Sequence, residues 1–169
     1  NFTSNTYQMK REILNFSAKI SRKLTKPEKK FTADMTYGIL ASKSCLLTDI
    51  VDQLHEKTQK VNSVERLTRH LNKGVHSNAL KSYLTTIHKW VPDNPIVHID
   101  DSDVVKPDGY KFEALGMVRD GSKSTDTKAV YQKGYHVTEA CVLTGNHHPV
   151  SIFSQIHSSK EKHFTSINA

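Results

Sequence analysis

Apolar residues recur at helical spacing in the first half of the chain. Between residues 7 and 24 the steps are three or four residues, which predicts one amphipathic helix. Similar spacing predicts helices over residues 32–42, 44–54 and 77–90. Pro27 separates the first two, because the residue before a proline disfavours the helical region. The apolar positions of the first helix are Met9, Ile13, Phe16, Ile20 and Leu24.

Another helix is predicted from residue 62 onward. Asn62 is followed three positions later by Glu65, which is the capping-box pattern, and Gly74 supplies a stop. The inner stripe of this helix consists of Val64, Leu67 and Leu71. Its opposite face is basic and consists of Arg66, Arg69, His70 and Lys73.

This basic face favours DNA binding. A helix that follows another helix and presents cations outward can read a groove or grip phosphates, as a helix-turn-helix does. The connection over residues 56–61 is long for that motif. An ordinary bundle helix with a solvated basic face therefore remains the alternative.

The pattern changes to short β-branched and apolar runs after a break at Pro92 and Pro95. These runs predict strands over residues 96–99, 135–143 and 150–156, with a hairpin turn over residues 145–149. Residues 112–118 are read either as a short strand or as a turn. The predicted sheet therefore has three strands and is mostly antiparallel.

Charge divides the chain at the same place. Residues 1–94 carry 16 basic and 8 acidic side chains, a net charge of +8, whereas residues 95–169 carry 8 basic and 9 acidic ones, a net charge of −1. Such a division favours a module that binds a polyanion, joined to a part with another role. We therefore predict an α+β fold, with an all-α helical bundle in residues 1–94 and the sheet in residues 95–169.

Composition excludes several classes of protein. The mean hydropathy is −0.55, and no apolar run approaches the ~20 residues that a membrane-spanning helix requires. The first residues do not resemble a secretory signal. Cys45 and Cys141 lie in different halves without metal-ligand spacing, so we expect both to be small buried residues in a reducing compartment. The expected location is cytoplasmic.

Three carboxylates follow the first predicted strand. Asp100, Asp101 and Asp103 fall within four residues, and they repel one another unless a divalent cation neutralises them. The alternative is that they cap or open a turn, for which Asp is well suited. His147 and His148 are not expected to bind a metal, because adjacent residues on a turn rarely converge on one ion.

The chain resembles the insertion-sequence transposases, which have an RNase H-like catalytic domain and a DDE triad of acids. In the second half the resemblance is carried by residues 95–107 (PIVHIDDSDVVKP), 119–124 (RDGSKS), 133–139 (KGYHVTE) and 149–159 (PVSIFSQIHSS). In the first half it is carried by residues 33–42 (ADMTYGILAS) and 64–71 (VERLTRHL), which resemble the family's DNA-binding region.

The resemblance implies a role for particular residues. The first triad acid stands in an Asp-x-Ser/Thr context, which matches Asp100, with Asp101 held in reserve. It further implies two Mg²⁺ or Mn²⁺ ions, with Asp100 as a metal ligand, that catalyse phosphodiester cleavage and strand transfer. The implied partner is double-stranded DNA at transposon ends, and a homodimer is left open.

The second Asp and the Glu of the triad have no counterpart in the sequence. Asp120 and Glu139 precede or lie within the predicted hairpin, whereas the family places these two acids after it. We therefore expect an amino-terminal, truncated portion of a transposase, with an incomplete RNase H-like domain and without strand-transfer activity of its own.

Two other functions are compatible with the same residues. One is a non-catalytic DNA-binding protein that uses only the basic helical half. The other is a phosphatase of the haloacid dehalogenase type, in which Asp101 would be the nucleophile and Asp103 the acid. That second alternative requires parallel strands alternating with helices, which residues 107–169 do not predict.

Overall fold

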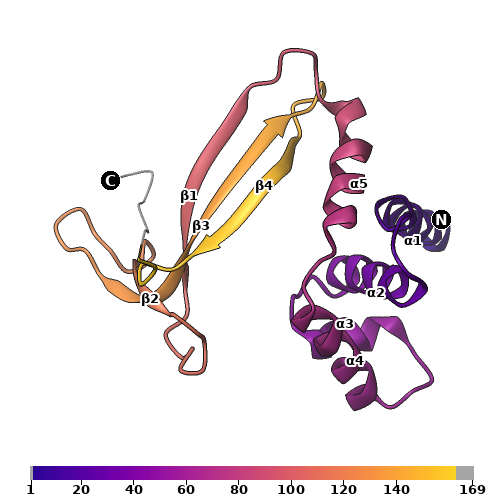
Figure 1. Cartoon of the computed structure of the whole chain (residues 1–169), viewed down its shortest axis with the longest axis horizontal. Coiled ribbons are helices and arrows are strands. Elements are labelled where there is room, and N and C mark those ends of the chain that lie inside the picture. The colour runs from indigo at the N-terminus through magenta and orange to yellow at the C-terminus, as the bar shows by residue number, and fades with distance from the viewer. Residues whose placement is uncertain (1, 163–169) are drawn as a thin grey trace. The chain divides into compact units, whose positions relative to one another are not determined.

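A computed structural model describes residues 2–162 of the chain, and the side chains of residues 6–162. In this part the backbone forms five α-helices followed by an open sheet of four strands, so the fold class is α+β (Figure 1). The chain divides into two compact units, Asn1–Lys89 and Trp90–Ala169. The first unit is helical and the second contains the sheet.

Five helices build the first unit, and the predicted helices all exist with shifted ends. Their bounds are α1 (Phe2–Ile20), α2 (Lys26–Ser42), α3 (Leu47–Leu54), α4 (Lys60–Asn72) and α5 (Ser77–Ile87), with a 3-10 turn η1 (His88–Trp90) after α5. The largest differences are in α1, which begins five residues and ends four residues before the predicted positions, and in α2, which begins six residues early.

Pro27 lies in the first turn of α2, which begins at Lys26, rather than in the break between the two helices. Proline is tolerated in the first helical turn, where its missing N–H would have no partner in any case. Thr25 is the N-cap, and its backbone N–H donates to the carboxylate of Glu28 at 2.8 Å. The Thr25 hydroxyl donates to the same carboxylate at 2.7 Å, and these bonds hold the pKa of Glu28 below its ordinary value. A capping box therefore stands here.

The capping box predicted at Asn62 and Glu65 is wrong. α4 begins two residues earlier, at Lys60, with Gln59 as its N-cap. Ser63 is buried, and its hydroxyl donates to the carboxylate of Glu56 at 2.6 Å instead of facing a helix end. The start of α4 is thus fixed by a contact with the preceding loop.

The core of the helical unit lies between α2, α3 and α4. Ile50 and Leu67 are fully buried and Val51 is nearly so, and each such side chain contributes about 1.5–3 kcal/mol. Gly38 of α2 lies against Ile50, and a Cβ at that position would overlap Cγ2 of Ile50. The residues that pack around this centre are Phe31, Met35, Ile39, Leu47 and Val64. Leu71, predicted to face inward, is 44% exposed.

Four strands build the sheet around one long central strand. Their bounds are β1 (Val97–Val105), β2 (Gly116–Arg119), β3 (Tyr131–Leu143) and β4 (Pro149–His157). β1 pairs with one edge of β3, and β2 and β4 pair with successive parts of its other edge, all antiparallel. The predicted hairpin between β3 and β4 is confirmed. The predicted three strands become four, because residues 116–119 pair with the start of β3.

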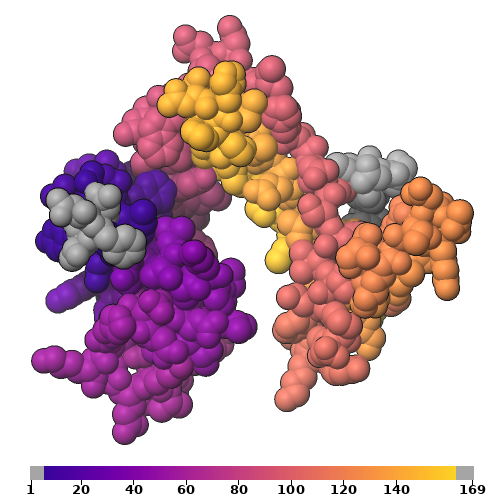
Figure 2. Space-filling view, turned by 180° about the vertical axis from the view of Figure 1, so that it is seen from behind, coloured from indigo at the N-terminus to yellow at the C-terminus, as the bar shows by residue number. Residues whose placement is uncertain are grey.

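Between Val97 and Lys162 the described chain contains no helix of its own. In Figure 2 the sheet unit, coloured from pink to yellow, is correspondingly elongated. Several apolar side chains of its strands are therefore open to solvent, among them Val97 (48%), Ile99 (61%), Phe153 (48%) and Ile156 (64%).

Both cysteines are more exposed than the sequence predicts. Cys45 is exposed in the segment before α3, and Cys141 is half-buried on β3. The expectation failed because Cys45 lies outside the helical core rather than on its inner stripe. Within the described residues, none of the helices is both long enough and apolar enough to cross a membrane.

Candidate functional site

Arg66, one of the four predicted DNA-binding residues, is engaged inside the helical unit. Its guanidinium forms ion pairs with Asp34 of α2 at 2.8 Å and with Glu56 at 3.0 Å. Its side chain is only 25% exposed. Both carboxylates also bind the ammonium of Lys30, at 2.9 Å and 2.5 Å. Arg66 therefore joins α4 to α2 and to the loop before α4, which leaves little of its charge for a DNA phosphate.

Glu56 is the centre of this ion-pair network. The hydrogen bond from Lys30, followed by that from the Ser63 hydroxyl, lowers the pKa of the Glu56 carboxyl to about 2. Burial lowers the pKa of Lys30, but hydrogen bonds to the carboxylates of Glu56 and Asp34 outweigh it and raise that pKa above its ordinary value. A carboxylate with three donors is held ionised at neutral pH, so the network fixes the position of α4 electrostatically.

The other three predicted residues of α4 differ from one another. His70 is half-buried and stacks on the ring of Phe31, with 5.0 Å between ring centroids and 17° between planes. Arg69 and Lys73 are exposed, and neither forms an ion pair within the described residues. The structure thus leaves Arg69 and Lys73 as the two cations of the predicted face that are available to a phosphate.

The three predicted acids lie inside β1 rather than at its end. β1 continues to Val105, so Asp100, Asp101 and Asp103 all belong to the strand. Successive side chains of a strand point to opposite faces, and Asp100 is therefore separated from the other two by the sheet itself. Both interpretations of the sequence, a metal-neutralised cluster at a strand end and a set of turn-capping acids, are therefore wrong about where these acids lie.

Asp101 and Asp103 share one face and are each bound across the strand pair. The hydroxyl of Thr138 donates to Asp101 at 2.5 Å. The imidazole Nδ1 of His136 lies 2.7 Å from Asp103. The register places each pair directly opposite, so β3 supplies both partners. Each of these two acids forms a cross-strand pair with a residue of β3.

Asp100 lies on the other face, opposite a second carboxylate. The register of β1 and β3 pairs Asp100 with Glu139, and both side chains are exposed. Neither makes an ion pair or a hydrogen bond within the described residues. Like charges directly opposite are destabilising, and two carboxylates are the kind of hard oxygen donors that a divalent cation binds. The sequence reasoning missed Glu139 because only the pairing register shows that the two acids are neighbours.

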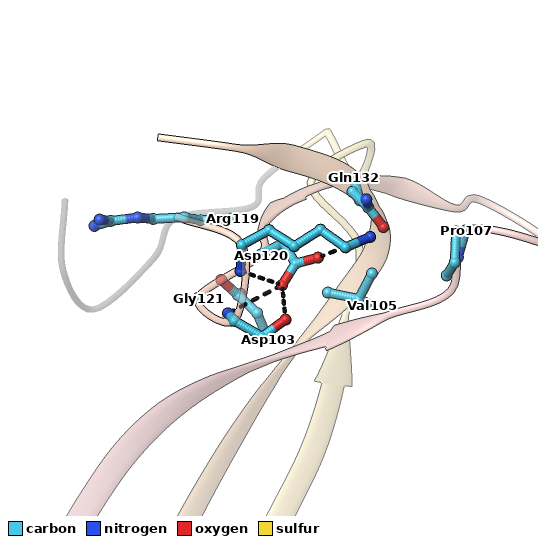
Figure 3. A pocket seen from close by; sticks show the side chains of 9 residues that line it. Asp103, Val105, Pro107, Arg119, Asp120, Gly121 and Gln132 are labelled. Atoms are coloured by element: carbon cyan, nitrogen blue, oxygen red, sulfur yellow. Dashed lines mark hydrogen bonds and ion pairs between the residues drawn. The ribbon is translucent and has the colours of Figure 1, made fainter. Parts of the chain in front are cut away.

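A hollow of about 680 Å³ lies beside the turn after β2 (Figure 3). Asp120 is buried there, and its carboxylate accepts from the hydroxyl of Ser122 at 2.5 Å and from the backbone N–H groups of Ser122 and Lys123. The hydroxyl of Ser122 above all holds the pKa of Asp120 below its ordinary value. Lys123 Nζ lies 3.7 Å away. Asp120 is therefore occupied in holding the turn.

The hollow is also lined by Asp103 and Gln132 from the neighbouring strands, as Figure 3 shows. Its cations and acids compensate one another, and Asp103 is paired with His136. Among the described residues there is no group of three His, Cys, Asp or Glu side chains that could hold a metal ion. The Asp100 and Glu139 pair is thus a two-carboxylate arrangement.

No protein-family model, no curated protein and no solved structure matches this chain.

Proposed function

We propose that the helical unit binds duplex DNA and that the chain contributes this unit, together with the first strands of an RNase H-like sheet, to an insertion-sequence transposase. The observation that carries the DNA-binding part is the segregation of charge. All of the net positive charge resides in residues 1–94, at +8, whereas residues 95–169 carry −1. A polyanion is the ligand class that such an excess favours.

The exposed cations of α4 support the same proposal. Arg69 and Lys73 lie one turn apart on the helix, which is the spacing at which side chains share a face. The ion pairs of Arg66 hold this helix against α2, so the two exposed cations are presented from a fixed support. A fixed support lowers the entropy lost when a phosphate is bound.

The acid-bearing sheet supports the second part of the proposal. β1 carries Asp100, stands at one edge of the described sheet, and faces Glu139 across its pairing with β3. Asp101 is engaged by Thr138, so Asp100 is the better placed of the two candidates. Asp100 and Glu139 would hold a divalent cation, Mg²⁺ or Mn²⁺, which would supply Lewis-acid activation in phosphodiester chemistry.

Strand transfer itself is not assigned to residues 2–162. Two-metal transfer uses three acids, and the described residues hold no group of three metal-ligating side chains. A non-catalytic DNA-binding protein is therefore the second candidate, favoured by the cross-strand pairing of Asp101 and Asp103. The phosphatase alternative is not proposed, because every strand pairing of the described sheet is antiparallel. A homodimer stays an untested prediction.

The dependence of DNA affinity on salt tests the DNA-binding proposal. The Kd of the full chain for a random-sequence duplex should rise steeply with NaCl concentration, because each phosphate contact releases counterions with a slope of about −0.9 in log K against log salt. Replacing two exposed cations, Arg69→Gln with Lys73→Gln, should reduce that slope by about 2.

A matched variant separates local contacts from total charge. Lys29→Gln with Lys57→Gln also removes two positive charges from exposed positions of the helical unit that lie outside α4. It should leave most of the slope intact. Affinity that does not change between low and high salt would contradict DNA binding through phosphates.

A further inference from the structure

A second basic surface lies between α1 and α5. It is a hollow of about 290 Å³ at the end of α1, where α5 passes beside it. The four cations that line it are Lys19, Arg22, Lys23 and Lys81, and the other lining residues are Ser82, Thr85 and Thr86. No acidic side chain belongs to this lining.

The packing of α1 against α5 brings these cations together. Phe16 of α1 meets Tyr83 of α5 edge to face, with ring centroids 6.4 Å apart, and Figure 1 shows the two helices as neighbours. Ser17 of α1 and Ser21, just after its end, are both buried. Residues about 60 positions apart in the sequence thus face one hollow.

The charges of the hollow are not balanced within the described residues. Lys19, Arg22, Lys23 and Lys81 are all exposed, and none of them forms an ion pair there. Elsewhere in the same unit Lys30, Lys60 and Arg66 each have a carboxylate partner. Four like charges around one hollow repel one another, and an anion bound among them would relieve that repulsion.

Two of the three hydroxyl groups that line the hollow are used in hydrogen bonds within α5. Thr85 and Thr86 donate to the backbone carbonyls of Lys81 and Ser82, at 2.8 Å and 2.7 Å. The charged groups of the lining are the four cations. Such cations contact backbone phosphates, which carry no sequence information, rather than base edges. The hollow, of about 290 Å³, has room for a hydrated phosphodiester group.

We propose that this α1–α5 hollow binds the phosphate backbone of duplex DNA, as a contact separate from the cations of α4. The inference rests on the proposed DNA-binding function and names a second place where it acts. A polyanion is favoured over a single free phosphate because four exposed cations can contact several phosphates of a charged backbone and release its counterions.

The test removes charge from the hollow in the full chain. Lys23→Gln with Lys81→Gln should reduce the slope of log K against log salt for a random-sequence duplex by about 2, since each lost phosphate contact removes about 0.9. The control variant Lys29→Gln with Lys57→Gln removes two exposed charges outside the hollow. A change in the hollow variant no larger than that of the control would overturn the proposal.

Two further measurements test whether the contact depends on charge and whether its ligand is DNA or free phosphate. The charge-retaining variant Lys23→Arg with Lys81→Arg should bind DNA like the parent chain, and a loss equal to that of the Gln variant would refute a charge-based contact. Inorganic phosphate should displace the duplex from the parent no better than chloride at equal ionic strength. Displacement by phosphate that is stronger in the parent than in the Gln variant would overturn DNA as the ligand, in favour of a free phosphate.

The outcome also separates this inference from the function on which it rests. If the parent chain does not bind duplex DNA at all, the proposed function fails, and the inference fails with it. A second outcome is that the parent binds duplex DNA, that the Arg69 and Lys73 variant binds more weakly, and that the hollow variant binds like the parent. In that case only the inference fails.

Discussion

Glu56 connects two helices of the first unit through one carboxylate. It accepts from Lys30 of α2 and from Ser63 and Arg66 of α4, and its side chain is 19% exposed. Because these donors stabilise the ionised form, the pKa of Glu56 is about 2 in the folded chain, against an ordinary value of 4.5. The resulting stabilisation is present above about pH 4.5 and is lost as the pH falls towards 2.

Replacement of this glutamate should therefore change how stability depends on pH. Glu56→Gln should lower the free energy of unfolding at pH 7 by about 1–3 kcal/mol, a range that allows for solvent screening at a partly exposed group. Its stability should also fall less than that of the parent between pH 4.5 and pH 2. Urea unfolding followed by circular dichroism at several pH values measures both effects.

Glu65→Gln is the matched control, since Glu65 is an exposed glutamate on α4 without an ion pair in the described residues. It should leave the pH profile of unfolding unchanged. An acid transition of Glu56→Gln that runs parallel to that of the parent would show that the network does not hold α4.

Helical periodicity predicts which residues lie on a helix but not which of them form tertiary ion pairs. Helical spacing correctly places Arg66 and Arg69 on α4, but it cannot distinguish their roles. Asp34 lies 32 positions before Arg66, and Glu56 lies in a loop, so neither partner follows from a local pattern. Which cation is paired inside the fold and which is open to DNA depends on tertiary contacts alone.

At the scale of elements, β1 sets the chemistry of its acids through its length and its register. Nine residues of strand carry Asp100, Asp101 and Asp103 on alternating faces. Thr138 and His136 of β3 occupy one face, and Glu139 the other. The strand therefore isolates one pair of facing carboxylates, which is where a divalent cation would stabilise the sheet.

A divalent cation should raise the melting temperature of the parent chain by binding Asp100 and Glu139. Asp100→Asn should remove the response to Mg²⁺ or Mn²⁺, and it should stabilise the cation-free sheet by about 0.2–1 kcal/mol, because it relieves repulsion between facing carboxylates. Thermal unfolding with and without the cation, in a chelator-treated buffer, measures both effects.

Asp126→Asn is a suitable control, because Asp126 is an exposed acid in the loop between β2 and β3. It should keep the full response to the cation. An equal response in Asp100→Asn and in the parent would contradict a site at this pair and would favour the non-catalytic DNA-binding protein.

Element ends were predicted less well than element types, for local reasons. Thr25 and Asn62 both precede a glutamate at the capping-box spacing, and only Thr25 forms the box. Ser63 is drawn into the core by Glu56, so the chain becomes helical before Asn62. β1 extends beyond its apolar residues because β3 supplies polar partners for the acids, which an apolar pattern cannot reveal.

At the scale of the whole molecule, the chain consists of a basic helical unit and a near-neutral sheet unit. The change from a period of three to four residues to strand-like runs predicted the α+β class, and the structure has it. The sequence left residues 112–118 open between a short strand and a turn, because β2 is only four residues long and its pairing with β3 is a long-range contact. The sequence likewise did not predict that several apolar side chains of the sheet are exposed to solvent.

The central claim is that DNA is bound by the helical unit, and a residue-by-residue titration tests it most directly. Amide chemical shifts of the isotope-labelled full chain would be followed by nuclear magnetic resonance as a random-sequence duplex is added. The largest changes in amide chemical shift should occur on α4 around Arg69 and Lys73 and in the α1–α5 hollow around Lys23 and Lys81. Shifts confined to the strands β1 to β4, with the helices unchanged, would contradict the central claim.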